Sequence, residues 1–183
     1  MPSLPRQRAI KTAQEYWLGQ PLFIDTETTG LDRLAEIVEI SVIDHFGDVV
    51  LDSLVRPMRR IPADVIRVHG ITNEMVRDAP TWAEVWPQVE GVLKERFVGV
   101  YNAEFDLRMM RQSHRSNGMA WQFRDNRFFC IMKLYAQFRG AYRWQKLEEA
   151  GRQCGISLPN THRAKDDALL ARAVLQHMVK VKI

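Results

Sequence analysis

Two carboxylates stand one residue apart at the end of a short apolar run, in the segment FIDTETTG at residues 23–30. Alternate residues of a β-strand project from the same face, so Asp25 and Glu27 are expected to point at one spot. Carboxylates held this close repel each other unless a cation lies between them or one keeps a proton. Hard divalent cations such as Mg²⁺ take oxygen ligands and often share them with substrate phosphates. The pair therefore predicts a metal site for phosphate chemistry, completed by further carboxylates.

Asp106 is the third candidate acid. It falls in the first turn of a helix predicted to begin after Asn102, directly behind an apolar segment at residues 97–101 that predicts a strand. A carboxylate in this place faces the C-terminal edge of the sheet, where open α/β folds bind their ligands. An acid that only complements the helix dipole is the alternative interpretation.

The fourth acid and a histidine occur near the end of the chain. Asp167 shares a predicted helical face with Leu170 and Ala171, so it should point at the core, whereas Asp166 should be more exposed. A buried carboxylate needs a cation or a hydrogen-bond donor. His162 lies in the preceding loop, and histidine is the side-chain type best suited to take a proton from water near neutral pH.

Four acids and one histidine are the parts required for hydrolysis of a phosphodiester with two metal ions. Two other hydrolase chemistries fit less well. An aspartic-type dyad needs a glycine where Glu27 stands and a second copy of the motif, which the sequence lacks. Zinc hydrolysis is disfavoured because the acids outnumber the histidines and no paired-histidine helix motif occurs.

Composition sets the broad class. A chain of 183 residues with 46% hydrophobic residues predicts one core. Without an apolar signal segment or a stretch long enough to cross a bilayer, we expect a cytoplasmic protein with no membrane partner. Cys130 and Cys154 are too few for a disulfide scaffold and are expected as free thiols. The net charge of +4 permits a polyanionic partner without requiring one.

The elements that must position these residues follow from periodicity. A helix is predicted over about 7–18, then an antiparallel meander of strands at about 22–25, 37–46 and 49–55. Thr81 is expected to cap a helix to about 96, and Asn102 to cap the next one. A further strand-to-helix change is predicted near 128–131, followed by helices at about 144–154 and 164–179. This order indicates a mixed central sheet flanked by helices, in the α/β class.

The chain resembles the DEDDh branch of the DnaQ-like 3′→5′ exonucleases, which have a ribonuclease H-like fold. Three motifs match in order, FIDTETTGL at 23–31, NAEFD at 102–106 and HRAKDDA at 162–168. The resemblance spans about 21–178. It implies a single exonuclease domain at 21–183, with residues 1–20 as a helical extension.

The resemblance also implies roles for individual residues. Two Mg²⁺ or Mn²⁺ ions would be held by Asp25, Glu27, Asp106 and Asp167, with His162 as general base. The implied substrate-binding residues are Thr28, Thr29, Leu31, His69, Asn102 and Phe105. Backbone near the two threonines would meet the terminal nucleotide, and Leu31 would wedge against its base.

Two positions near the implied pocket need separate mention. His69 belongs to the segment VHGIT at 68–72, which also looks like a family segment, and local capping is its alternative role. Tyr101 departs from the family pattern, because relatives commonly carry histidine there. That departure affects expected substrate contacts and leaves the acids untouched.

The implied function is a metal-dependent exonuclease that releases nucleoside 5′-monophosphates from a free 3′ end, with single-stranded DNA favoured. A homodimer or a larger nucleic-acid-processing complex is compatible with it. Basic and aromatic residues are available to track a strand, namely Arg108, Arg111, His114, Arg115, Arg139, Tyr142, Arg143 and Lys146. The alternatives are a binding or assembly module without turnover and an RNA-trimming exoribonuclease, since the motifs do not identify the sugar.

Overall fold

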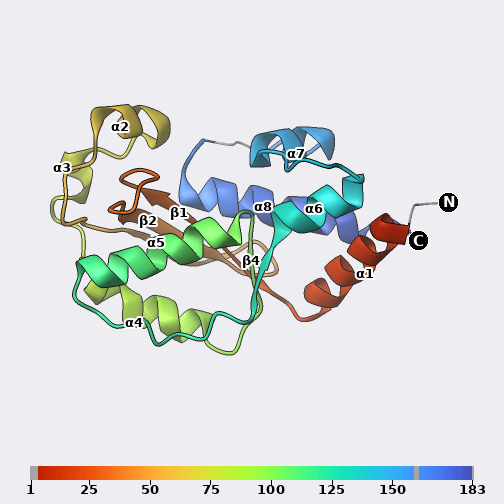
Figure 1. Cartoon of the computed structure of the whole chain (residues 1–183), viewed down its shortest axis with the longest axis horizontal. Helices are drawn as coiled ribbons and strands as arrows, with labels where there is room; N and C mark the ends of the chain where they lie inside the picture. Colours follow the sequence, from red (N-terminus) through yellow and green to blue (C-terminus); the bar gives the residue numbers. More distant parts are fainter. Residues whose placement is uncertain (1–3, 159–160, 183) are drawn as a thin grey trace.

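A five-stranded sheet with the order β3-β2-β1-β4-β5 runs through the middle of the computed structural model (Figure 1). The structure describes residues 4–158 and 161–182. Its strands are β1 (Leu22–Thr28), β2 (Ile37–Ile43), β3 (Val49–Leu54), β4 (Val98–Val100) and β5 (Phe128–Cys130). Its helices are α1 (Leu4–Leu18), α2 (Ala63–His69), α3 (Asn73–Val76), α4 (Trp82–Leu93), α5 (Ala103–Ser116), α6 (Ile131–Arg139), α7 (Leu147–Gln153) and α8 (Ala164–Val179).

The sheet is mixed, as predicted. Strands β1, β2 and β3 form the expected antiparallel meander, β4 pairs in parallel with β1, and β5 pairs in parallel with β4. Strand β2 ends at Ile43, earlier than predicted, because the Asp44 carboxylate accepts hydrogen bonds from the backbone N–H groups of the following turn. These come from Phe46 at 2.8 Å, and from Gly47 and Asp48 at 2.9 Å.

Helices cover both faces of the sheet (Figure 1). Along β1, Phe23 packs with α1, α6 and α8 on one face, whereas Leu22 and Ile24 pack with α4 and α5 on the other. This alternation follows from the period of two in a strand. It also fixes the direction of Asp25 and Glu27, which share the face of Phe23 and therefore lie under α8.

Helix α1 packs against the main core. Ala9, Ile10 and Ala13 are buried in the cluster that contains α6 and α8, and the ring of Tyr16 stacks on that of Phe129 with centroids 3.9 Å apart. The division between residues 1–20 and 21–183 remains a prediction about domain organisation.

The helix predicted from residue 144 begins at Leu147 instead. The hydroxyl of Tyr101 donates to the carbonyl of Gln145 at 3.0 Å, and the carbonyl of Lys146 lies 3.4 Å away. Trp144 therefore stands in a loop. In the predicted loop 157–163, Pro159 and Asn160 lie outside the described residues, as do residues 1–3 and 183.

Candidate active site

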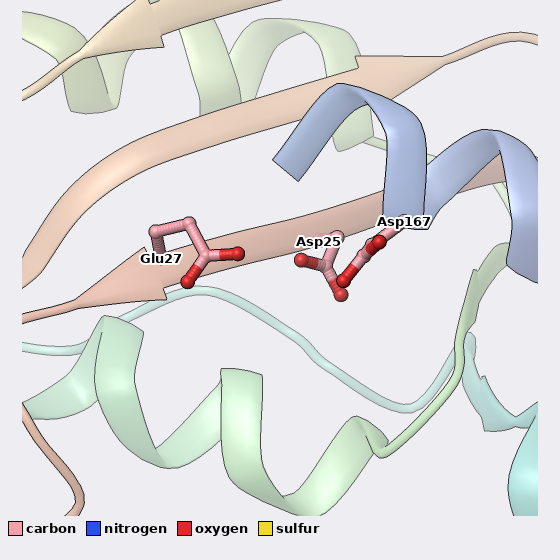
Figure 2. Close-up of side chains that lie close together, drawn as sticks. All are labelled: Asp25, Glu27 and Asp167. Atoms are coloured by element: carbon pink, nitrogen blue, oxygen red, sulfur yellow. The ribbon is translucent and has the colours of Figure 1, made fainter. Parts of the chain in front are cut away.

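Three carboxylates converge where the end of β1 meets the first turn of α8. Figure 2 shows Asp25 and Glu27 on the strand and Asp167 descending from the helix. One ligand oxygen from each lies within 4.8 Å of the others. Asp167 is buried and Asp166 is half-buried, so the inward position predicted from the helical phase is confirmed.

The group fits a hard divalent cation. The Oδ1 atom of Asp167 is buried and accepts no hydrogen bond within the described part of the chain. A buried carboxylate oxygen without a donor is costly unless a cation compensates it. Oxygen-only ligands from carboxylates are the set that Mg²⁺ and Mn²⁺ prefer.

Asp106 approaches the group from the other face of the sheet. It lies in the first turn of α5, is buried, and its Oδ1 accepts a 2.8 Å hydrogen bond from the hydroxyl of Thr26. Thr26 stands between the two acids of β1 and points away from them. Asp106 lines the same pocket, but it is outside the set of three whose ligand atoms lie within 4.8 Å.

Burial of so many acids together raises their pKa values. Loss of solvation is the largest cause for each, and it raises the pKa of Glu27 to about 8, of Asp106 to about 7 and of Asp167 to about 6. The pKa of Asp25 also lies well above its ordinary value, with the charge of Asp106 as the second cause. In the absence of a cation, the group therefore holds protons near neutral pH.

His162 lies in the turn before α8, where it lines the pocket and is exposed. Its φ of 51° is in the left-handed region, which is uncommon for residues other than glycine. Beside it, the Thr161 hydroxyl donates to Asp166 at 2.6 Å. The charge of His162 opposes the rise in the pKa of Asp167, and both residues line the same pocket.

Glu39 is a residue of this site that the sequence analysis missed. It sits on β2 opposite Glu27 and is buried. Its Oε1 and Oε2 atoms lie 3.0 and 3.1 Å from Nε of Arg163, whose Nη2 also contacts Oε1. Oε2 accepts from the backbone N–H of Ala164 at 2.9 Å, so Glu39 caps α8. The only sequence signal was an acid within the apolar strand IVEISVI.

A pocket of about 710 Å³ opens over these residues. Its lining includes every predicted catalytic and substrate-binding residue, namely Asp25, Glu27, Thr28, Thr29, Leu31, His69, Asn102, Phe105, Asp106, His162 and Asp167. Leu31 is 76% exposed at the rim, whereas the side chains of Thr28 and Thr29 are buried. The volume lies in the range of about 300–1,000 Å³ typical of small-molecule sites.

Both ring nitrogens of His69 are engaged by the protein. Nδ1 accepts from the backbone N–H of Ile71 at 3.0 Å, which leaves the proton on Nε2 to donate to the carbonyl of Thr28 at 3.2 Å. Burial lowers the pKa of His69, which favours the neutral imidazole. The imidazole joins the turn that follows α2 to the end of β1, and contact with substrate stays a prediction.

Two expectations about this region were wrong. Helix α5 begins after Asn102, but the Asn102 side chain makes no capping hydrogen bond and is exposed at the pocket instead. His114 cannot meet a nucleic acid, because it is buried in the core, where its Nδ1 accepts from the indole of Trp82 at 3.0 Å.

Comparison with known proteins identifies the family. A sequence model described as an exonuclease (RNase_T) matches residues 22–175. The chain belongs to this exonuclease family. It is 39% identical over 186 residues to the uncharacterized exonuclease CP81 of Escherichia phage 186, covering 95% of this chain and 93% of that protein. Exonucleases of this family depend on a metal, in keeping with the acidic cluster.

Solved structures confirm the ribonuclease H-like fold. The chain superposes on exonuclease X in complex with 5′ overhanging duplex DNA with a TM-score of 0.64 and 28% identity, covering 86% of this chain and 90% of that one. The nuclease domain of 3′hExo, a DEDDh family member bound to rAMP, has the same fold, with a TM-score of 0.74 and 20% identity. The match covers 86% of this chain and 90% of that one. The predicted membership of the DnaQ-like exonuclease family is confirmed. None of the helices in the described ranges is long and apolar enough to cross a membrane.

Proposed function

We propose that this exonuclease removes nucleoside 5′-monophosphates one at a time from a free 3′ end, with DNA as the favoured substrate. The observation that carries the proposal is the convergence of Asp25, Glu27 and Asp167, with one buried Asp167 oxygen lacking any donor in the described structure. Asp106 and His162 border the same pocket. Together they supply the acids and the base that phosphodiester hydrolysis requires.

The four acids would hold two Mg²⁺ or Mn²⁺ ions. Bound there, such ions supply Lewis-acid activation of the phosphate and offset the charge that develops on the attacking and leaving oxygens. The pocket positions the terminal nucleotide, with Leu31 at the rim and the end of β1 along one wall.

His162 would act as the general base. It accepts a proton from a water molecule as the water oxygen forms a bond to phosphorus, while the bond from phosphorus to the 3′ oxygen of the penultimate nucleotide breaks. The leaving oxygen takes up a proton and becomes the new 3′ hydroxyl. Because His162 is exposed in a turn, it can exchange the proton it received with solvent.

The favoured sugar is a separate part of the proposal. Exonuclease X, at 28% identity, is bound to DNA in its solved structure, which supports DNA. The 3′hExo domain binds rAMP, so an exoribonuclease with the same fold is the second candidate. Recognition of the 2′ position distinguishes the two, and that depends on contacts within the pocket.

A labelled-substrate assay tests the proposal. We expect 5′-labelled single-stranded DNA to shorten from its 3′ end with Mg²⁺ or Mn²⁺ and to stay intact with EDTA. Asp167→Asn should lower the rate by about 100-fold or more, the scale seen when one charge-stabilising group is removed from an active site. The matched control is Asp166→Asn, which changes the neighbouring, more exposed acid and should retain most activity.

Other outcomes separate the alternatives. Shortening of RNA alone would replace the DNA preference with the exoribonuclease. Binding without shortening of any substrate would indicate a module that lacks turnover. Cleavage in EDTA, or full activity in Asp167→Asn, would reject the metal site.

A further inference from the structure

The loop at residues 140–146 connects α6 to α7 (Figure 1). It exposes two aromatic side chains within three residues. Tyr142 is fully exposed and Trp144 is 62% exposed. Large aromatic side chains usually bury most of their surface, and several exposed together mark an interaction site more often than one alone. Trp82 and Trp86, by contrast, are buried in the core.

The loop is held at the rim of the active-site pocket. The Tyr101 hydroxyl donates to the carbonyl of Gln145, and Gln145 donates to the carbonyl of Arg143 at 2.8 Å. Tyr101 and Leu147, the first residue of α7, both line the pocket. The exposed rings therefore belong to a loop that is anchored to the wall of the site.

Lys133 links Trp144 to the start of α5, the helix that contains Asp106. The ammonium of Lys133 lies 5.9 Å from the centre of the Trp144 ring, and the same ammonium pairs with Glu104. Glu104 precedes Asp106 by two residues on α5. This places Trp144 on the side of the pocket formed by the start of α5.

Charge distinguishes this rim from the pocket itself. No lysine or arginine is among the described residues that line the pocket. Besides the proposed catalytic acids, Asp32 and Asp64 also line it, so the pocket is acidic. The loop side provides three exposed cations, Arg139, Arg143 and Lys146. Within residues 4–158 and 161–182, none of these three forms an ion pair with an acid. A phosphate chain that leaves the pocket is therefore attracted toward this loop.

We infer that the loop 140–146 is a stacking platform for single-stranded nucleic acid. Bases upstream of the penultimate nucleotide rest against Tyr142 and Trp144, while Arg143 and Lys146 meet the intervening phosphates. The inference rests on the proposed function, to which it adds a second binding surface and a reason for single-strand preference. Bases stack on protein side chains when they are unpaired, and stacking tolerates any base because each has a π-face.

The test compares a long and a short substrate. The double variant Tyr142→Ala/Trp144→Ala should lower kcat/KM on 5′-fluorescein-dT15 by about ten- to a hundredfold, as expected for lost base stacking. On the dinucleotide dTpdT, which ends inside the pocket, it should match the wild type. Phe46→Ala is the control, because Phe46 is 71% exposed in the β2–β3 turn at the opposite end of the sheet from the site.

A salt titration tests the cations. In fluorescence anisotropy with 5′-fluorescein-dT15, Arg143→Ala/Lys146→Ala should reduce the slope of log affinity against log salt by about 0.7 for each cation removed. An unchanged slope contradicts the phosphate contacts.

The outcomes separate this inference from the exonuclease proposal. Suppose that the wild type shortens both oligonucleotides. If the aromatic double variant then keeps its kcat/KM on dT15, or loses the same factor on dT15 and dTpdT, the platform is wrong and the exonuclease proposal stands. If the wild type shortens neither, the exonuclease proposal fails. Anisotropy with dT15 then still decides the platform, because binding needs no turnover.

Discussion

The carboxylate of Glu39 makes two kinds of contact: it pairs with the Arg163 guanidinium and caps the first turn of α8. Arg163 follows His162 directly, and Asp167 lies one turn further along the helix. The positions of the proposed base and of one proposed metal ligand thus depend on a side chain from β2. Glu39 is not among the described residues that line the pocket, so we regard it as a positioning residue.

Replacing the Glu39 carboxylate should show whether it positions the site, which would lower kcat, or binds substrate, which would raise KM. Glu39→Gln keeps the size of the side chain but removes the charge opposite Arg163, so we expect kcat on single-stranded DNA to fall by about tenfold, the scale of lost outer-shell support. KM should change little. Stability should fall by about 1–2 kcal/mol, less than for a fully buried pair, because the Arg163 side chain is 41% exposed.

Steady-state kinetics and urea unfolding check this. Glu95→Gln is the control, because it removes a partner of Arg127 in an ion pair whose glutamate is 75% exposed. Equal kcat in wild type and Glu39→Gln would show that the pair only stabilises the fold.

Among the elements, the close approach of α7 to α8 depends on a glycine. A Cβ atom added to Gly151 would lie 2.8 Å from Cδ1 of Leu170, which is buried. Leu170 follows Asp167 by one helical turn. The packing of α7 is therefore linked to the direction in which α8 presents its acid to the site.

Two glycine substitutions should have opposite effects. Gly151→Ala should lower the free energy of unfolding by about 1–3 kcal/mol through overpacking, with reduced nuclease activity. At Gly91, in α4, an added Cβ would meet no atom within 4 Å. Gly91→Ala should therefore raise the free energy of unfolding by about 0.5–1 kcal/mol. Urea unfolding measures both. A stabilised Gly151→Ala would show that Leu170 moves aside freely.

At this same scale, periodicity was enough to predict most elements, and α8 has the predicted bounds of 164–179. The phase of that helix also distinguished Asp167 from Asp166. What local pattern could not reveal depends on distant contacts. The later start of α7 depends on the Tyr101 hydroxyl, and the cap of α8 comes from Glu39, 124 residues before Arg163.

For the whole molecule, the main electrostatic feature is a cluster of acids enclosed between the sheet and α8. Their pKa values are raised in the folded state, to about 8 for Glu27 and about 6 for Asp167. The folded protein therefore binds protons more tightly than the unfolded chain does. The contribution of these acids to metal-free stability therefore falls as pH rises from about 4, where unfolded carboxyl groups titrate, through about 8.

Thermal unfolding in EDTA should show this trend. We expect Tm to decrease between pH 5 and pH 8, and Mg²⁺ or Mn²⁺ to raise Tm more at pH 8, where fewer protons compete for the carboxylates. The variant Asp25→Asn/Asp167→Asn should have a flatter profile and a smaller response to metal. If the wild type and this variant show the same pH dependence and the same response, the acids do not form a cation site.

The parts of the acidic cluster also come from opposite ends of the chain, with Asp25 on the first strand and Asp167 on the last helix. A chain emerging from the ribosome displays the first pair of acids long before it contains the last one. The proposed nuclease centre can close only after α8 has been translated and has docked. Synthesis itself therefore delays hydrolytic activity until the fold is complete.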